Sequence, residues 1–338
     1  MEQSQKVKEL LSSPQKIVIT THQRADGDAI GSSLGMFHYL RKKNHQVNFI
    51  SPTDYPEFLK WMPGNENVII YEKESAKSKQ LVEQATVIFC LDFNKLYRLE
   101  ELGTLIEKSS ATKILIDHHL EPDDFAEYKF CNEKASSTSE LVYDFILKLE
   151  EKSLIDAAIA TCLYAGILMD TDRFRIPSTS PSVHRVVAEL MEYGIDHTNI
   201  YQELYETFSE NRLRFFGYCI REKLEVIKDL RCGIIALEKE DLNRFSIQLG
   251  DTEGLVNYPL WIKDVVVSAL ITPKQKEVKL SLRSKGNFSV EKICREHFGG
   301  GGHRNASGGS SQLSVKETRE KLISIFARAK NELHSAEK

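Results

Sequence analysis

The first half of the chain alternates short runs of β-branched residues with segments of helical length. The apolar runs predict strands, and the segments between them predict amphipathic helices. This alternation requires crossover connections and therefore a mostly parallel sheet with helices on both faces, a doubly wound α/β fold. Strands are expected at Lys16–Thr21, Val47–Ile50, Val68–Ile70, Val87–Leu91 and Lys113–Ile116, and helices at Ala29–Lys43, Ser75–Gln84, Leu96–Lys108 and Ser139–Leu149.

The second half predicts a smaller, mixed α/β domain. The pattern turns helical after Ser153, and a polar stretch punctuated by Gly194 resembles a connector. We expect a first domain at residues 1–188, a helical connector at 189–211 and a second domain at 212–338. In the second domain, strands are expected at Leu230–Leu237, Val265–Thr272 and Glu277–Leu282, and helices at Glu240–Ser246, Val290–Phe298 and Val315–His334.

Length and charge limit the partners of such a protein. The 338 residues are enough for two domains, each with its own core. Lys and Arg number 45 against 49 Asp and Glu, a formal net charge of −4, whereas binding a long DNA duplex requires a broad basic surface. The balance still permits a small phosphorylated ligand held by a few well-placed cations.

The six cysteines form no C-x-x-C pair, so neither a zinc ribbon nor a thioredoxin-like redox site is indicated. The polar first residues, MEQSQKVKELL, lack the apolar core of a signal peptide. The longest apolar stretch, Ala157 to Met169, is shorter than the roughly 20 residues of a membrane span. We expect a cytoplasmic protein with reduced thiols and no membrane partner.

The first group of candidate metal ligands follows the first expected strand, in the sequence THQRADGD. Ligand sites in open parallel sheets lie outside the carboxyl ends of the strands. The imidazole of His22 with the carboxylates of Asp26 and Asp28 suits Mn²⁺ or Mg²⁺ better than zinc. The alternative is an ordinary helix start, with Asp28 as the N-cap and no chemical role for His22.

Two further expected strands end in similar residues. Asp92 directly follows Val87–Leu91, and the sequence Asp117-His118-His119 follows Lys113–Ile116. A single aspartate at a strand end is usually a turn residue. Three strand ends that deliver acids or imidazoles to one sheet edge indicate a shared site instead.

Asp170 ends the apolar helix expected at Ala157–Met169. A carboxylate at this end meets the negative pole of the helix dipole, so a positive partner is expected. We favour a metal ion, and Arg173 or Arg175 is the structural alternative. Four carboxylates and two imidazoles are too many hard ligands for one ion and suit a two-metal site that clamps a phosphate. The six candidate ligands are His22, Asp26, Asp28, Asp92, His118 and Asp170.

A glycine-rich segment, FGGGGHRNASGG at residues 298–309, is the main feature of the second domain. Successive glycines expose backbone N–H groups and let an anion approach closely. His303 and Arg283 would add charge, and the alternative is a flexible loop. The G-x-x-x-x-G-K-S/T pattern of a P-loop is absent from the sequence.

The order of these motifs resembles the DHH phosphoesterase superfamily, in the subgroup with a DHH-associated C-terminal domain. The chain is similar to the bacterial nano-RNases, oligoribonucleases that also dephosphorylate 3′-phosphoadenosine 5′-phosphate (pAp). Two residues depart from the usual pattern: Ala25 replaces a proline, and Asp172 replaces the glycine of a Thr-Gly pair. The extra carboxylate of Asp172 is expected to alter metal preference or to repel a substrate phosphate.

The resemblance implies two Mn²⁺ ions, with Mg²⁺ or Co²⁺ as alternatives. One ion would be bound by His22 and Asp26, the other by Asp28, His118 and Asp170, with Asp92 as the bridge. Catalytic roles are implied for His119, Asp92 and Arg98, and substrate binding for Arg98, Arg283, Gly301, Gly302 and His303.

The implied activity is hydrolysis of oligoribonucleotides of about two to five nucleotides to mononucleotides, together with removal of the 3′-phosphate of pAp. The partner would be short single-stranded RNA or a nucleotide. The alternatives are a cyclic-dinucleotide or linear-dinucleotide phosphodiesterase of the same superfamily and a non-catalytic nucleotide-binding sensor. Exposed helical surface on the first domain also leaves room for a homodimer.

Overall fold

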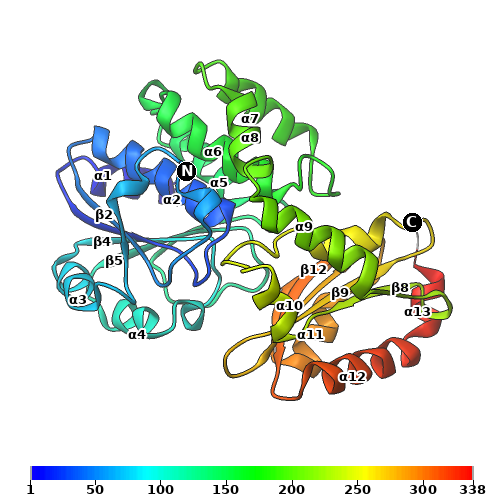
Figure 1. Cartoon of the computed structure of the whole chain (residues 1–338). Helices are drawn as coiled ribbons and strands as arrows, with labels where there is room; N and C mark the ends of the chain where they lie inside the picture. Colours follow the sequence, from blue (N-terminus) through cyan, green and yellow to red (C-terminus); the bar gives the residue numbers. More distant parts are fainter. Residues whose placement is uncertain (1, 337–338) are drawn as a thin grey trace. The chain divides into compact units, whose positions relative to one another are not determined.

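The computed structural model describes residues 2–336, which form two compact units. The first unit extends to Thr207 and the second begins at Phe208, as the colours of Figure 1 allow the reader to follow. The division falls between two helices, α8 (His197–Tyr205) and α9 (Glu210–Tyr218). Residues 189–211, expected as a connector, hold the end of α7 (Pro181–Met191), all of α8 and the start of α9.

The first unit is built on a sheet of six parallel strands in the order β3-β2-β1-β4-β5-β6. This confirms the predicted doubly wound α/β fold. The sixth strand was not predicted, because its short sequence Tyr-Lys-Phe-Cys is only half buried at the sheet edge. The strands are β1 (Lys16–Thr20), β2 (Gln46–Ser51), β3 (Val68–Ile70), β4 (Val87–Leu91), β5 (Thr112–Asp117) and β6 (Tyr128–Cys131).

Helices cover both faces of this sheet (Figure 1). Alternate strand residues point to opposite faces, so Ile17 and Ile19 pack in one core while Val18 packs in the other. Both faces of the strands are therefore apolar, as the continuous apolar runs predict. The first core includes residues of α1 (Glu2–Leu10), α2 (Gly27–Lys42), α5 (Thr138–Lys148) and α6 (Ala157–Asp170), and the second includes residues of α3 (Ser75–Gln84) and α4 (Glu101–Lys108).

The single helix expected at Leu96–Lys108 is wrong. A 3₁₀ turn, η3 (Leu96–Leu99), is separated from α4 by Glu100, whose φ is +53°. The turn brings Leu96 against Gly103, where a Cβ atom would lie 2.1 Å from the Leu96 carbonyl oxygen. The break therefore depends on a close backbone approach, which periodicity does not reveal.

Helices α2 and α6 approach each other closely along a row of glycines. Gly27, Gly31 and Gly35 lie one helical turn apart and face α6. A Cβ atom on Gly31 would lie only 2.5 Å from the Cys162 carbonyl oxygen. Because backbone atoms block this position, a larger residue would push the two helices apart.

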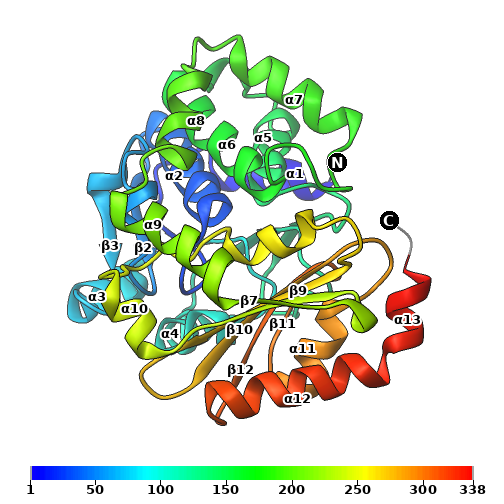
Figure 2. The same cartoon turned by 45° about the vertical axis from the view of Figure 1, so that its right-hand side comes forward.

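The second unit contains a mixed sheet in the order β11-β12-β10-β9-β8-β7, with parallel pairing only between β8 and β9 among its described strands. Figure 2 shows α11 and α12 along one face of it. The opposite face is covered by α9, α10 and the 3₁₀ helix η7. The elements are β7 (Leu224–Ile227), β8 (Cys232–Ala236), α10 (Lys239–Arg244), η7 (Leu255–Trp261), β9 (Val267–Pro273), β10 (Val278–Ser284), α11 (Val290–Phe298), β11 (Gly301–His303), β12 (Ala306–Ser311), α12 (Val315–Arg328) and α13 (Lys330–Ser335).

The closing helix expected at Val315–His334 is interrupted at Ala329, which separates α12 from α13. Short helical turns complete the structure at Glu57–Leu59, Asn65–Asn67, Lys152–Leu154, Cys219–Lys223 and Lys228–Leu230. None of the helices within residues 2–336 is both long enough and apolar enough to cross a membrane. The six cysteines are free thiols, and five of them are buried.

The glycine-rich segment forms a hairpin of β11 and β12 rather than an irregular loop. Gly300 packs directly on the second strand, where a Cβ atom would lie 1.9 Å from the Gly308 carbonyl oxygen. By contrast, no atom lies within 4 Å of the Cβ position of Gly301. Packing within the described chain therefore requires a glycine at position 300 and not at position 301.

The helix contact predicts opposite effects of alanine at two helical glycines. Gly31→Ala should destabilise the protein by about 1–3 kcal/mol, because the new methyl group meets the backbone of α6. Gly217→Ala in α9 meets nothing within 4 Å and should be neutral or stabilising by up to about 1 kcal/mol. Thermal unfolding of both variants measures the difference, and equal stabilities would contradict the close packing of α2 and α6.

Candidate metal centre

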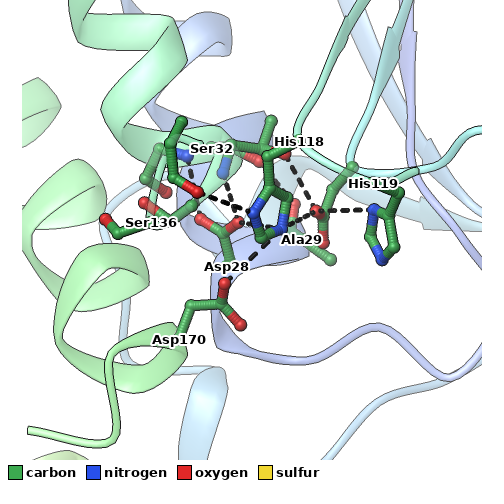
Figure 3. Close-up of polar contacts among 12 residues, drawn as sticks. Asp28, Ala29, Ser32, His118, His119, Ser136 and Asp170 are labelled. Atoms are coloured by element: carbon green, nitrogen blue, oxygen red, sulfur yellow. Dashed lines mark hydrogen bonds and ion pairs between the residues drawn. The ribbon is translucent and has the colours of Figure 1, made fainter. Parts of the chain in front are cut away.

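The structure brings all six predicted metal ligands together at the carboxyl edge of the first sheet. His22, Asp92 and His118 follow β1, β4 and β5, while Asp28 lies in the first turn of α2 and Asp170 ends α6. Figure 3 shows the carboxylates of Asp28 and Asp170 directed toward the ring of His118. The remaining ligand, Asp26, immediately precedes α2.

Asp92 occupies the centre of the cluster. Its Oδ2 lies 3.4 Å from His22 Nε2, and its Oδ1 lies 3.5 Å from His118 Nε2. The two oxygens of one carboxylate thus face two separate groups of ligands. The backbone of Asp92 is left-handed, with φ at +64°, a strained conformation for an aspartate that is often found at functional sites.

The first ligand group contains His22, Asp26 and Asp92. His22 Nδ1 lies 2.8 Å from the Gln23 carbonyl, which only accepts, so Nδ1 carries the proton and Nε2 faces the carboxylates. The alternative prediction that Asp28 caps α2 is wrong. The N-cap is Asp26, whose Oδ1 accepts from the backbone amides of Asp28 and Ala29, while its Oδ2 lies 4.0 Å from His22 Nε2.

The second ligand group contains Asp28, Asp92 and His118, with Asp170 beside them. The Asp28 carboxylate accepts hydrogen bonds from the backbone amides of Thr138 (2.6 Å) and Ser139 (2.9 Å) in the first turn of α5. A helix N-terminus favours negative charge, so α5 holds this buried carboxylate in place. His118 Nε2 lies 4.0 Å from Asp28 Oδ2 and 3.4 Å from Asp170 Oδ2.

The two arginines considered as partners of Asp170 pair with another residue. Both Arg173 and Arg175 form ion pairs with Asp172. The charged partner that Asp170 does contact is His118. Asp172 therefore does not present an unpaired carboxylate next to the cluster.

Burial and mutual repulsion perturb the pKa values of the acids in this cluster. Burial raises the pKa of Asp28 well above its usual range, and the charges of Asp92 and Asp170 add to the effect. Burial likewise raises the pKa of Asp170 to about 7. Burial would also raise the pKa of Asp92, but hydrogen bonds with His118 and His22 hold it well below its usual range.

The pKa values of the two imidazoles are raised as well. Burial alone would lower the pKa of His118 and of His22, but the hydrogen bond with Asp92 and the negative charges of the surrounding carboxylates together outweigh it, so both pKa values are raised. The two imidazoles, Asp28 and Asp170 therefore hold their protons more tightly than they would in water. This charge pattern and the mixed nitrogen and oxygen donors fit a pair of divalent cations, which would replace those protons.

His119, Arg98 and Asp117 form a chain of contacts beside the cluster. His119 Nδ1 lies 2.7 Å from Asp117 Oδ1, so it donates to this buried carboxylate. On the other side of the ring, Arg98 Nη1 lies 3.2 Å from His119 Nε2. Asp117 was not predicted as a site residue, although it is the first residue of the Asp-His-His sequence. Thr138 and Ser139 were also missed. The only sequence signal for these two residues was the serine-rich start of their helix.

Of the residues predicted to bind substrate, Arg98 lies in the first unit beside His119, and the other four lie in the second unit. In the register of its sheet, Arg283 of β10 pairs with Ala306 of β12, which also pairs with His303 of β11. Directly paired residues share a face of the sheet, so Arg283 and His303 point to the same side, two strands or about 9.6 Å apart. Gly301 and Gly302 precede His303 on the edge strand.

Comparisons with known proteins agree with this architecture. Residues 16–167 match the model of the DHH family N-terminal domain, and residues 241–332 match the DHHA1 domain. A probable bifunctional oligoribonuclease and PAP phosphatase NrnA of Streptococcus mutans is 30% identical over 87% of this chain and 89% of its own. The corresponding Thermus thermophilus protein is also 30% identical, over 91% of this chain and 88% of its own.

Two other similar proteins are a solved structure that matches the whole chain and a longer enzyme of which the chain matches about half. The crystal structure of an exopolyphosphatase-related protein from Bacteroides fragilis is 38% identical and superposes with a TM-score of 0.95, covering 99% of this chain and 98% of that chain. The cyclic-di-AMP phosphodiesterase GdpP of Geobacillus thermodenitrificans is 25% identical over 94% of this chain, which corresponds to 48% of GdpP. The matched domains and the end-to-end similarity confirm the resemblance found in the sequence: this chain belongs to the DHH family and carries a DHHA1 domain.

Proposed function

We propose that the protein is a metal-dependent phosphoesterase that degrades oligoribonucleotides of about two to five nucleotides to mononucleotides and removes the 3′-phosphate of pAp. The observation that carries the proposal is the position of Asp92, which offers one oxygen to each of two ligand groups. The activities named for the relatives from Streptococcus mutans and Thermus thermophilus, which are similar over most of both chains, support the same substrates.

Two divalent cations, when bound, would supply positive charge to a phosphate and activate water for hydrolysis. His22, Asp26 and Asp92 would hold one of them, and Asp28, Asp92, His118 and Asp170 the other. A mixture of imidazole and carboxylate ligands suits Mn²⁺ well, and Mg²⁺ or Co²⁺ are the alternatives. The identity of the metal, the cytoplasmic location and a homodimer stay predictions.

Three residues beside the cluster would donate a proton to the leaving oxygen and neutralise the charge of the phosphate: Asp117, His119 and Arg98. Asp117 accepts from His119 Nδ1 and thereby fixes the ring, so that Nε2 is the atom available to a substrate. Arg98 now donates to this Nε2. A phosphate that drew the guanidinium toward itself would leave Nε2 free to hold a proton for the departing oxygen.

The second unit would bind the part of the substrate that is not cleaved. Arg283 and His303 share one sheet face, and the edge strand beside them offers an unobstructed backbone at Gly301. This arrangement suits a phosphate or a nucleotide, because a guanidinium, an imidazole and a free strand edge all donate hydrogen bonds to anions.

A phosphodiesterase acting on cyclic or linear dinucleotides is the alternative, given the similarity to GdpP over 48% of that protein. A non-catalytic sensor is the other, although each of the six candidate ligands is present in this chain. A panel of pAp, di- to pentaribonucleotides and cyclic dinucleotides, assayed with Mn²⁺ and Mg²⁺, separates the three. Release of mononucleotides and AMP supports the proposal, and tight binding without turnover would contradict it.

Asp92→Asn should lower kcat more than about a hundredfold and reduce the metal content, because both ligand groups lose their shared carboxylate. The control is Asp124→Asn, which removes an equal charge from a fully exposed side chain of the same unit. Metal analysis and turnover of pAp check both variants. A fully active Asp92→Asn enzyme with two bound metals would refute the bridging role.

Gly301→Ala should leave thermal stability unchanged and raise KM for pAp, because the methyl group meets no protein atom but occupies space that an anion would use. Gly300→Ala should instead lower stability, since its methyl group meets the Gly308 carbonyl. Unfolding curves and steady-state kinetics distinguish the two. An unchanged KM in the Gly301 variant would exclude this position from substrate binding.

Metal affinity should rise with pH. Asp170, whose pKa is raised to about 7, and His118, whose pKa is also raised, must lose protons before they can bind a cation. We expect the affinity for Mn²⁺ to be at least about tenfold higher at pH 8 than at pH 6. Calorimetry in two buffers of different ionisation enthalpy measures both affinity and proton release. Binding that is independent of pH would contradict the assigned protonation.

A further inference from the structure

The segment immediately after Asp170 has an unusual backbone. Asp172, Arg173 and Phe174 have φ values of +45°, +62° and +63°, three consecutive left-handed residues none of which is glycine. Left-handed residues other than glycine cost free energy and usually occur singly. Such a segment persists only where surrounding interactions hold it, and functional sites are where these segments concentrate.

This segment contains a bridge between one carboxylate and two guanidinium groups. Asp172 Oδ1 accepts from Arg173 Nη2 at 2.9 Å, and Asp172 Oδ2 accepts from Arg175 Nε at 3.0 Å and also from Arg175 Nη2. Arg173 also lies over the ring of Tyr205, at 5.0 Å from its centroid. Both arginine side chains are therefore fixed in orientation by contacts on the same unit.

The bridge carries a net positive charge that remains accessible to solvent. One carboxylate faces two guanidinium groups, and the arginine side chains are 38% and 49% exposed. A guanidinium has five N–H donors. The bridge occupies one of those on Arg173 and two on Arg175, and Arg173 makes a further hydrogen bond with Tyr201, which leaves donors on both side chains. Planar, pre-oriented donors of this kind suit phosphate better than a mobile lysine does.

The bridge lies next to the candidate metal centre. The amides of Asp172 and Arg173 donate to the carbonyls of Met169 and Leu168, which folds the segment back on the end of α6. Asp170 and Asp172 are two peptide units apart, so their Cα atoms are within about 7.6 Å of each other. A phosphate next to the one held at the metals would therefore be within reach of these long side chains.

We propose that Asp172 positions Arg173 and Arg175 as a binding site for a second substrate phosphate, one that is not hydrolysed. The inference rests on the proposed function and specifies its substrates: nucleotides with a phosphate beyond the scissile one, such as pAp and short RNAs with a 5′-phosphate. The sequence alone suggested the reverse, that the Asp172 carboxylate repels a phosphate. The two ideas predict opposite effects of removing its charge.

The test compares two dinucleotides that differ in one phosphate. ApA contains only the scissile phosphate, whereas pApA carries an additional 5′-phosphate. Asp172→Asn should raise KM for pApA about tenfold, because the arginines lose the charge that orients them, while kcat and the kinetics of ApA stay unchanged. A lower KM for pApA would show repulsion instead, and either that result or an unchanged KM would overturn the proposal.

Two further variants complete the experiment. Arg175→Gln should raise KM for pApA selectively, and Arg185→Gln, which removes the same charge from the exposed face of α7, should not. If Asp172→Asn fails to fold, Asp172→Gly replaces it, since glycine tolerates the left-handed backbone and also lacks the carboxylate. Loss of ApA and pApA turnover in the variants alike would also contradict a selective phosphate site.

If the proposed function is wrong, the wild-type protein will hydrolyse neither ApA nor pApA. In that case equilibrium binding of pApA and ApA to the same variants, measured by calorimetry with Mn²⁺ present, still tests the phosphate site. Equal affinities of the wild-type protein for the two dinucleotides would overturn it.

Discussion

Mutual repulsion among buried carboxylates is the constraint around which the first unit is organised. Asp28, Asp92 and Asp170 meet at one sheet edge, and the chain compensates for them with imidazoles and a helix N-terminus rather than with lysines. Lysine or arginine ion pairs would stabilise the folded protein but would occupy the oxygens that metals need. The repulsion among these carboxylates is therefore left for a bound cation to neutralise. The raised pKa values of Asp28 and Asp170 reflect this repulsion and the burial of both groups.

Five of the six strands of the first sheet, most of its helices and the convergence of the six candidate ligands could be predicted from the sequence, but β6 and the break between η3 and α4 could not. Strands buried on both faces are continuous apolar runs, and residues that follow neighbouring parallel strands must meet at one edge. What the sequence did not reveal depends on contacts between distant segments. Asp28 is held by amides about 110 positions away, and the glycine-rich segment becomes a hairpin because it pairs with β10 despite the low strand propensity of glycine.

The two units hold their candidate site residues in place in different ways. In the first, side chains are fixed one by one, as when Asp117 orients His119 or Asp172 orients two arginines. In the second, the register of a sheet aligns Arg283 with His303 across an intervening alanine. Register is a collective property, so a slip between any two of these three strands would move Arg283 and His303 out of alignment.

The hydrogen bonds from the first turn of α5 to Asp28 have a practical consequence for capturing a bound RNA. An inactive enzyme is often made by replacing an acidic metal ligand. Asp28, however, also connects α2 to α5, because its carboxylate accepts hydrogen bonds from the backbone amides in the first turn of α5. Replacing it would loosen the scaffold along with the chemistry. Under the proposed function, His119 is the better position for such a substitution, because the hydrogen bonds described above join its ring to Arg98 and Asp117 and not to the backbone of a helix.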